Sequence, residues 1–555
     1  MKKKIIIPSI ILLVLLGIVL FIVLLPKTYT LKINKTNKVS LTLKNNKEKK
    51  IKLKVEENNK NIVLKDFNTK QNTNYIVYIL KSNNKIINKG LIHNTDKTII
   101  PNISKGEYTL SIIYKGINKF KVKGEISLDE DNNEYSTLQS GYVISNKIKE
   151  YAPRDINDKT IKNIKIAKKM DDQYKDDSHV VSTLDSKKPI YMWVDNDTLY
   201  FYSDNKIEYG KDTMSMFAYL TVLTDASDLK YIKADKVEDM QSMFFYDESL
   251  SDIKFMSYYN TPNLESVDNM FWKCFSLSDI TPLISLETDK LESMSYFLDE
   301  TIVKDISVFE YLNTDKLTDI NSFISSTKVE DITPIKNWNV SKVTDMGGAF
   351  ASIRIKNVDA LKDWDVSKVE NMSFIFDCAV DLENIDGIKN WNTKSLKRIK
   401  RGFAYTNITN VNALSKWNTK KLKDIDGIFK QTRKLNNIKG IRKWNTKNIE
   451  SFDYLFEYSG ITSVKDLSKW NTSKVNSMEG TFSHTKLKSL KGLEKWDTSK
   501  VEKFNYTFSH LKTKDVKSIE KWNIDNGNSF EKTFYKAKVT PKWNGTFDEE
   551  GNYTK

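Results

Sequence analysis

One recurring stretch decides the fold, and its clearest copy reads Trp338-Asn339-Val340-Ser341-Lys342-Val343-Thr344-Asp345-Met346-Gly347-Gly348-Ala349-Phe350. Its Trp returns every 26 or 27 residues through eight copies, and a Phe stands twelve residues after each Trp. A fixed period of this length indicates a stacked-repeat protein, in which each unit buries its apolar face against its neighbours. The two ladders expected to form the core are Trp338, Trp364, Trp391, Trp417, Trp444, Trp470, Trp496, Trp522, Phe350, Phe376, Phe403, Phe429, Phe456, Phe482, Phe508 and Phe534.

Each unit has one apolar pattern after its Trp and another before it. The spacing of Val343, Met346 and Phe350 is typical of a short helix, and Asn and Ser residues before it can cap the free amides. Upstream of each Trp, aliphatic residues stand at three, six and nine positions, which favours the short strand and corner of a leucine-rich coil. The sequence therefore predicts an α/β solenoid over residues 229–540: a right-handed, leucine-rich-repeat-like array of about twelve units, each with a short strand plus a short helix.

The repeat has a recognisable relative. The stretch from Trp338 to Phe350 resembles the repeat of BspA-like leucine-rich repeat surface proteins, which also occurs, with unassigned function, in surface lipoproteins of wall-less bacteria. Segment 187–217 is similar to the hairpin that opens the array in that family, and segment 543–554 is similar to its closing cap. The resemblance covers about residues 138–555 and implies adhesion to proteins of host or neighbouring cells.

The N-terminus carries a different signal. Three lysines, Lys2 to Lys4, precede an apolar run from Ile5 to Leu25, which as a helix would be about 31 Å long, enough for a bilayer core. The run lacks a small-residue cleavage site, which favours an uncleaved anchor over residues 1–26 rather than a cleaved signal peptide. We therefore expect a single-pass membrane protein that has this helix in the membrane and residues 27–555 extracellular.

Three further segments complete the predicted organisation. Residues 27–125 alternate apolar and polar side chains between Asn, Lys and Gly turns, which predicts a small, basic, all-β domain of the sandwich type. Residues 126–137 are acidic and are expected to form a linker. The family resemblance places an N-terminal cap of the array at 138–228 and a C-terminal cap at 541–555.

Charge is distributed unevenly along the chain. The formal net charge is +16, yet residues 27–125 hold 22 Lys against seven Asp and Glu, and the region from residue 126 onward sums to −2. Only six of the 88 basic residues are Arg, the side chain that reads bases in pairs of hydrogen bonds, which argues against nucleic acid as a partner. The lysines are placed to meet anionic lipid or wall polymer, or they reflect an A/T-rich coding sequence.

Catalytic and metal-binding patterns are nearly absent from the sequence. Its four His and two Cys are too few and too scattered for a zinc site or a Cys-His pair. Two of the histidines each fall fourteen residues after a repeat Trp and should stack on adjacent coils, but no third ligand is in view. We expect no enzyme, no cofactor and no metal. The four histidines are His93, His179, His484 and His510, and the two cysteines are Cys274 and Cys378.

Polar residues between the aliphatic positions upstream of each Trp form the candidate binding face. They differ from copy to copy while the frame around them is constant, as a recognition surface requires. The candidates are Lys356, Asn357, Asp359, Glu383, Asn384, Asp386, Thr409, Asn410, Asn412, Asn436, Asn437 and Lys439. The predicted function is an adhesin-like surface protein that binds a protein or glycan of a host or neighbouring cell. The alternative is a structural or immune-facing coat protein without a fixed ligand.

Overall fold

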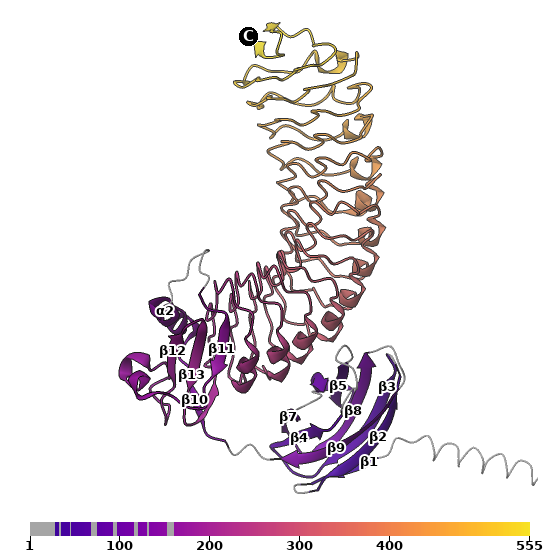
Figure 1. Ribbon diagram of the computed structural model, residues 1–555. Helices are drawn as coiled ribbons and strands as arrows, with labels where there is room; N and C mark the ends of the chain where they lie inside the picture. The colour runs from indigo at the N-terminus through magenta and orange to yellow at the C-terminus, as the bar shows by residue number, and fades with distance from the viewer. Residues whose placement is uncertain are drawn as a thin grey trace, which may run out of the picture. The chain divides into compact units, whose positions relative to one another are not determined.

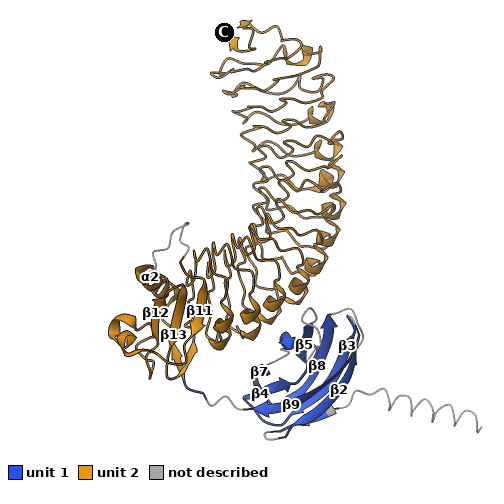
Figure 2. Cartoon of the chain, viewed as in Figure 1, with its two compact units in different colours: residues 1–134 blue, residues 135–555 orange. Residues whose placement is uncertain are grey.

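The chain forms two compact units, residues 1–134 and 135–555, each described by itself (Figure 2). The computed structural model describes residues 28–32, 35–44, 46–67, 75–92, 97–115, 120–129, 133–151 and 160–555.

The first unit contains two β-sheets that share one apolar core (Figure 1). One sheet has the strand order β1-β3-β8-β5-β6 and the other β2-β9-β4-β7, and the paired strands are antiparallel except β1 with β3. Alternate residues of a strand point to opposite faces; in β3, Leu53 and Val55 are buried while Lys52 and Lys54 are exposed. The strands are β1 Thr28–Leu31, β2 Asn37–Leu43, β3 Glu48–Val55, β4 Lys60–Lys65, β5 Tyr75–Ser82, β6 Lys85–Ile92, β7 Thr98–Ile103, β8 Gly106–Lys115 and β9 Phe120–Asp129.

Part of the segment expected to be a linker is strand. β9 continues to Asp129, and β10 (Tyr135–Thr137) pairs in parallel with β14 (Lys206–Glu208) of the second unit. The residues predicted as linker, 126–137, therefore contribute to both units.

The second unit opens with a cap of mixed structure. Its helix α2 (Gly141–Tyr151) is the one α-helix among the described residues. Beside it, β12 (Tyr191–Asp195) and β13 (Thr198–Tyr202) form a hairpin, and β11 (Asn163–Ile166) adds in parallel to β13. The opposite end of the unit closes with a hairpin of β15 (Thr546–Phe547) and β16 (Tyr553–Thr554).

Between the caps, coils stack on one another through backbone hydrogen bonds. Single parallel bridges join equivalent positions of consecutive coils from Asp212 to Asp424 and from Ser451 to Ser529. After each bridge, alternate amides donate to the next coil: the N–H of Met346 to Asn371 O at 3.1 Å, of Gly348 to Ser373 O at 2.8 Å and of Phe350 to Ile375 O at 3.0 Å. We call this part of each coil the turn segment.

Left-handed residues shape the turn segment. Two positions per coil, ten and fourteen residues after the Trp, have positive φ, as at Gly348 (63°) and Ser352 (58°). Only Gly adopts this conformation without steric cost. A left-handed residue interrupts the hand of a right-handed helix, so the segment cannot continue as one. Its backbone groups instead bond to the neighbouring coils.

Short 3-10 helices occupy the other side of every coil except the one that leads into Trp496, and they line one side of the stack in Figure 1. Each lies just upstream of a Trp or of its equivalent. A 3-10 helix has three residues per turn, which accounts for the aliphatic spacing of three. They are η3 Ser227–Tyr231, η4 Lys254–Tyr258, η5 Thr281–Ser285, η6 Ser307–Tyr311, η7 Thr333–Ile335, η8 Asp359–Leu361, η9 Asp386–Ile388, η10 Asn412–Lys416, η11 Lys439–Ile441, η12 Lys465–Leu467 and η13 Lys517–Ile519.

The prediction of an α/β solenoid with a short strand plus a short helix in each unit is therefore wrong. The segment from Val343 to Phe350, expected to be helical, forms turns and inter-coil bonds. The segment expected to be the strand contains the 3-10 helix. The apolar offsets of three and four arise because successive turns point every third or fourth side chain inward, as a helix would.

The Trp ladder holds the coils together from inside. All eight Trp side chains are buried, and each indole donates to a carbonyl of the preceding coil, as from Trp417 Nε1 to Ile388 O at 3.2 Å. The ladder Phe side chains are buried as well. Neighbouring Trp rings stack with centroids 6.4 Å apart at Trp444 and Trp470, and 6.2 Å apart at Trp496 and Trp522. Each Trp thus contributes both apolar burial and a satisfied hydrogen bond.

The membrane prediction needs correction. No helix in the part of the chain that the structure describes is long and apolar enough to cross a membrane. A spanning helix needs about 20 apolar residues, whereas α2 has 11. The predicted helix over residues 1–26 lies outside the described residues. The prediction of a single-pass membrane protein with residues 27–555 extracellular therefore has no spanning helix to support it and is not retained.

Trp417→Ala should destabilise the coils around it. Removal of a buried indole costs about 3–5 kcal/mol, and Trp417→Phe, which keeps an aromatic ring but loses the bond to Ile388 O, should cost less. Native-state hydrogen exchange should show the loss of protection centred on residues 388–444. An equal loss in residues 46–67 of the first unit, or no loss at all, would contradict this account of the core.

Candidate functional site

The twelve residues of the predicted binding face lie at the first residues of η8 to η11 and in the segments that lead into these helices. All are exposed except Asn410 and Asn437, which are half-buried. Parallel bridges join Asn357 to Asn384 and Asn410 to Asn437, so the structure does align these positions on neighbouring coils.

Four residues of the predicted face have a structural task. The side-chain oxygens of Asn357, Asn384, Asn410 and Asn437 each accept the backbone N–H two residues later, at 2.7 to 3.1 Å. Such turns supply a local partner for the first amides of the 3-10 helix. These asparagines shape the coil, which leaves the other eight side chains of the predicted face for contact with a partner.

A second surface lies along the turn segments. Because Met346, Ala349 and Phe350 point into the core, the side chains nine, ten and fourteen residues after each Trp lie toward the surface, as do some of those thirteen residues after it, such as Phe245 and Trp272. We call these outward positions the turn face. They change in type from coil to coil, whereas the positions of Met346 and Phe350 remain apolar and that of Ala349 becomes Thr only in the last three coils.

Aromatic side chains gather on the turn face of the N-terminal coils, and Phe275 lies beside it. Phe245 lies 5.1 Å from both Tyr219 and Trp272, and Trp272 lies 4.9 Å from Tyr296, measured between ring centroids. Phe275 is 41% exposed, and the other rings are half-buried. We call this group the aromatic cluster; its members are Tyr219, Phe245, Tyr246, Trp272, Phe275 and Tyr296.

Charged groups lie beside the aromatic cluster. Lys273 Nζ is 5.1 Å from the Tyr246 ring centroid and 5.3 Å from that of Trp272, within the range of a cation–π contact. Trp272 Nε1 donates to Glu300 Oε1 at 3.3 Å. Next to Glu300, burial raises the pKa of Asp299 to about 6, and its Oδ1 has no hydrogen-bond partner. The cluster therefore offers aromatic, cationic and anionic groups together.

Sequence reasoning missed the aromatic cluster because its members occupy no constant place in the repeat. Phe245 and Trp272 stand at the thirteenth residue after the Trp-equivalent position, whereas Tyr296 stands at the tenth. A usable signal was present: large aromatics replace small or polar residues at outward positions of several consecutive coils.

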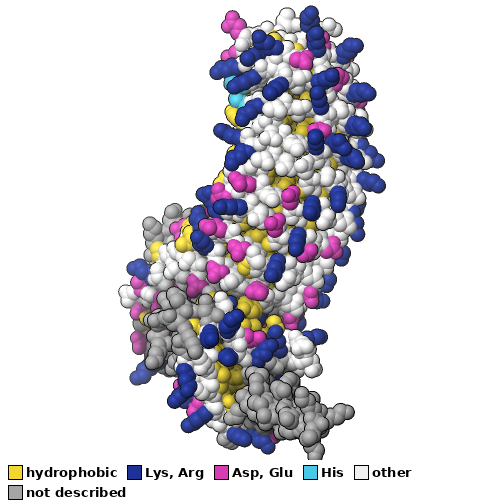
Figure 3. Space-filling view, turned by 90° about the vertical axis from the view of Figure 1, so that its right-hand side faces the viewer, with side chains coloured by type: hydrophobic (Ala, Val, Ile, Leu, Met, Phe, Trp, Pro, Cys, Tyr) yellow, Lys and Arg dark blue, Asp and Glu magenta, His cyan; other side chains and the backbone are white. Residues whose placement is uncertain are grey.

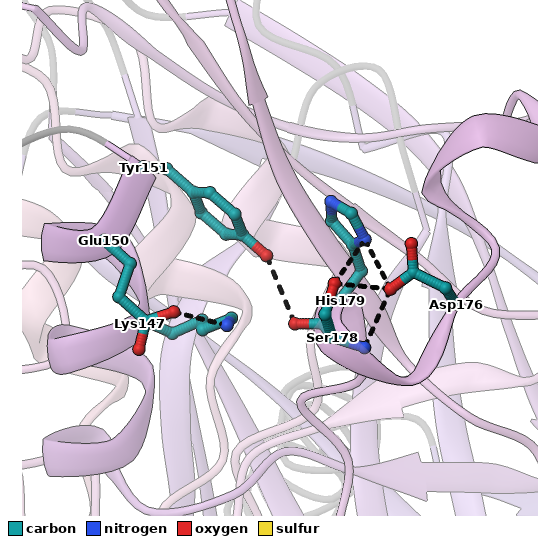
Figure 4. Close-up of polar contacts among 6 residues, drawn as sticks. All are labelled: Lys147, Glu150, Tyr151, Asp176, Ser178 and His179. Carbon is teal, nitrogen blue, oxygen red and sulfur yellow. Dashed lines mark hydrogen bonds and ion pairs between the residues drawn. The ribbon is translucent and has the colours of Figure 1, made fainter.

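A polar cluster in the N-terminal cap has the residue types of a catalytic triad (Figure 4). His179 Nδ1 lies 3.1 Å from Asp176 Oδ1 and 3.3 Å from Ser178 Oγ, and Tyr151 donates to Ser178 O at 3.4 Å. A triad needs Asp and Ser on opposite nitrogens of the imidazole. Here both contact Nδ1, and Asp176 also caps the 3-10 helix η2 (Asp177–His179). The cluster is therefore a structural cap.

The two histidines predicted to stack do so. The rings of His484 and His510 lie 3.8 Å apart, and Tyr458 covers the other face of His484 at 4.0 Å. Burial, and secondly His510, lowers the pKa of His484 to about 4, so its ring is neutral at physiological pH. Among the described residues, no group of three or more His, Cys, Asp or Glu is placed to hold a metal ion. His93 lies outside that part of the chain.

Comparison with known proteins identifies one family. A family model described as "Mycoplasma protein of unknown function, DUF285" matches four overlapping stretches, residues 211–333, 300–411, 381–488 and 458–548. Together they span the coils and more than half of the chain. No curated protein and no solved structure matches.

Stability of the array should fall as pH rises through about 6. Burial raises the pKa of both Asp299 and Asp426 to about 6, above the ordinary value of 3.8. These two carboxyls therefore contribute fully to the free energy of unfolding below pH 4. Their contribution is lost as the pH rises past their pKa in the folded state. Between pH 5 and 7.5 the expected loss is about 1–2 kcal/mol in total.

Denaturant unfolding at several pH values measures this dependence. The double variant Asp299→Asn, Asp426→Asn should show a flatter profile between pH 5 and 7.5 than the unmodified chain. A profile of unchanged slope would mean that these carboxyls are not the groups responsible.

Proposed function

The chain belongs to the family of Mycoplasma proteins of unknown function DUF285, and from that premise we propose that it is an adhesin-like surface binding protein. Its repeat array would contact macromolecules of a host or neighbouring cell. The resemblance of the repeat to BspA-like surface proteins supports this proposal by analogy. The protein is proposed to act by binding alone, without catalysis.

The aromatic cluster is the observation that carries the proposal. Tyr, Trp and Phe are enriched in the cores of protein interfaces and supply a large share of binding energy. Six of them meet on neighbouring coils, and Phe275 is 41% exposed. A contiguous group of partly exposed apolar side chains, as opposed to a single one, marks a site of interaction.

The frame beneath the cluster suits recognition. Backbone bonds between coils hold the residues that carry the rings, as from Tyr246 N–H to Trp272 O at 2.9 Å and from Lys273 N–H to Asp299 O at 3.0 Å. A surface fixed before binding loses little conformational entropy when a partner docks. The rings are thus preorganised for a partner.

A triple variant tests the proposal. Phe245→Ser, Trp272→Ser and Tyr296→Ser together should reduce attachment of the labelled full chain to cultured host cells by about tenfold or more, because hot-spot residues contribute about 2 kcal/mol or more each. Attachment is measured as a saturation curve by flow cytometry. Thermal unfolding of each variant shows whether the array is still folded.

Phe374→Ser is the matched control, because Phe374 is an exposed aromatic at the same turn-face position as Tyr296 in a coil outside the cluster. It should leave attachment unchanged. If the triple variant attaches as well as the unmodified protein, the aromatic cluster is not the site. If the unmodified protein attaches saturably to no host or bacterial surface, the proposal fails in favour of a coat protein without a fixed ligand.

A further inference from the structure

The net charge of the array is close to zero because an acidic half and a basic half nearly cancel. Residues 205–390 hold 33 Asp and Glu against 18 Lys and Arg, whereas residues 391–555 hold 34 Lys and Arg against 17 Asp and Glu. The formal charges are −15 and +17. In Figure 3, Lys and Arg dominate the C-terminal coils, and Asp and Glu become frequent toward the N-terminal coils. Fields of this size attract and orient a charged partner.

One part of this charge is a regular column, which we call the lysine column. In five consecutive coils a Lys stands directly before the repeat Trp, and each of these side chains is exposed. None forms an ion pair with a residue that the structure describes. The column comprises Lys416, Lys443, Lys469, Lys495 and Lys521. In the coils before it, the equivalent positions hold Tyr, Ser, Asn or Asp.

A second column of donors runs beside the first. In four of the five coils the residue after the Trp is Asn, whose side-chain oxygen accepts the N–H two residues later at 3.0 to 3.2 Å. Its amide nitrogen then remains a donor, and no described residue accepts from it. This asparagine column comprises Asn418, Asn445, Asn471 and Asn523.

In the acidic half, the Asn at this position donates its side-chain N–H to another residue of the array. Asn313 donates from Nδ2 to Asp289 at 2.7 Å, and Asn339 donates to Asp315 at 2.8 Å. An Asp of the preceding coil thus takes up the donor. For each Asn of the asparagine column, the residue of the preceding coil that is equivalent to that Asp is Lys or Ser: Lys394, Lys420, Lys447 and Ser499. The donors there are left for an external acceptor.

The coils of the two columns lie close together. The buried Trp that separates the two columns stacks on its neighbour with ring centroids 6.4 Å apart at Trp444 and Trp470, and 6.2 Å apart at Trp496 and Trp522. Ammonium groups therefore recur about every 6 Å at these two steps, with an amide donor beside each Lys of the column except in the coil of Trp496, where Asp497 stands in place of Asn. A linear partner with closely repeated anionic groups matches such a row.

We propose that the C-terminal coils bind a linear anionic polysaccharide, sulfated or carboxylated, along the lysine and asparagine columns. The inference rests on the proposed binding function and names a partner class for it. The ammonium groups meet the sulfates or carboxylates, and the amides donate to these groups or to sugar hydroxyls. The acidic half repels the polymer and confines it to the C-terminal coils.

The strip between the columns favours a polysaccharide over a nucleic acid. Proteins that bind single strands stack the bases on exposed aromatic side chains. Here the Trp between each Lys and Asn is buried, with 4–6% exposure in the five coils. The column also contains Lys alone, and no Arg, the residue that reads bases bidentately. The strip offers charge and hydrogen-bond donors but no base-stacking surface.

Heparin and hyaluronate, one sulfated and one carboxylated, are the probes, each titrated against the full chain at several salt concentrations. Replacing the five lysines of the column with Gln should weaken binding of at least one probe by about tenfold or more and flatten its salt dependence. Replacing them with Arg should preserve binding. The Gln substitutions are all at exposed positions, so thermal unfolding should be unchanged.

A charge-matched control separates the column from bulk basicity. Lys38, Lys52, Lys54, Lys121 and Lys123 lie exposed on the outer faces of the first unit, and their replacement with Gln removes the same charge. Binding should persist in this control. Equal loss in both variants, or no binding of either probe by the unmodified chain, would overturn the proposal.

Two further outcomes would show that the partner is not a polysaccharide. If duplex DNA competes as well as heparin at equal charge concentration, the site does not select polysaccharide. If the unmodified chain instead self-associates at low salt in sedimentation velocity, and the Gln variant does not, the acidic half of a second copy is the partner. Attachment that depends on the aromatic cluster would survive either result, so failure here is distinguishable from failure of the proposed function.

Discussion

Backbone hydrogen bonds from each coil to the next are the interaction on which the array depends. The turn segments contain no extended strand, so their amides and carbonyls find partners mainly in the neighbouring coil or within a single turn. An unpaired buried backbone group is costly, and the stack must therefore be closed at its end. The C-terminal hairpin region does this, because Gly551 O accepts the N–H of Phe534 where another coil would otherwise stand. Left-handed residues at two positions per coil direct the backbone toward these bonds.

This division between frame and surface allows one fold to carry different chemistry along its length. The inward Trp, Phe and aliphatic residues repeat, while the outward positions change without disturbing the coil. Aromatic rings collect on the N-terminal turn face, and Lys and Asn form columns on the C-terminal coils. At the position after the Trp, the side-chain N–H of Asn339 donates to Asp315, whereas that of Asn418 has no acceptor among the described residues. The two proposed contact surfaces thus use a common frame with different side chains.

The repeat period and the buried ladders could be predicted from the sequence, because core positions must be apolar in every coil. The local structure could not. Val343, Met346 and Phe350 have helical spacing, yet a left-handed residue at position 348 redirects the chain, and positive φ at non-Gly positions leaves little trace in the residue types. Ser, Tyr, His, Lys and Phe all occupy such positions here. The aromatic cluster and the charge halves were also missed, since outward residues follow no period and opposite charges cancel in a sum over the whole array.

Replacement of Gly427 tests the left-handed turn segment most directly. Gly427 has φ 59° and lies inside the segment from Leu422 to Phe429, which is equivalent to the stretch from Val343 to Phe350 that was expected to be helical. Gly427→Ala should therefore introduce strain and lower the local free energy of unfolding, by about 1 kcal/mol, whereas in a short helix the same substitution would stabilise by about 0.5–1 kcal/mol. Native-state hydrogen exchange of the amides between residues 425 and 457 measures the change in the full chain. Reduced protection is the result that our account predicts, and increased protection would contradict it.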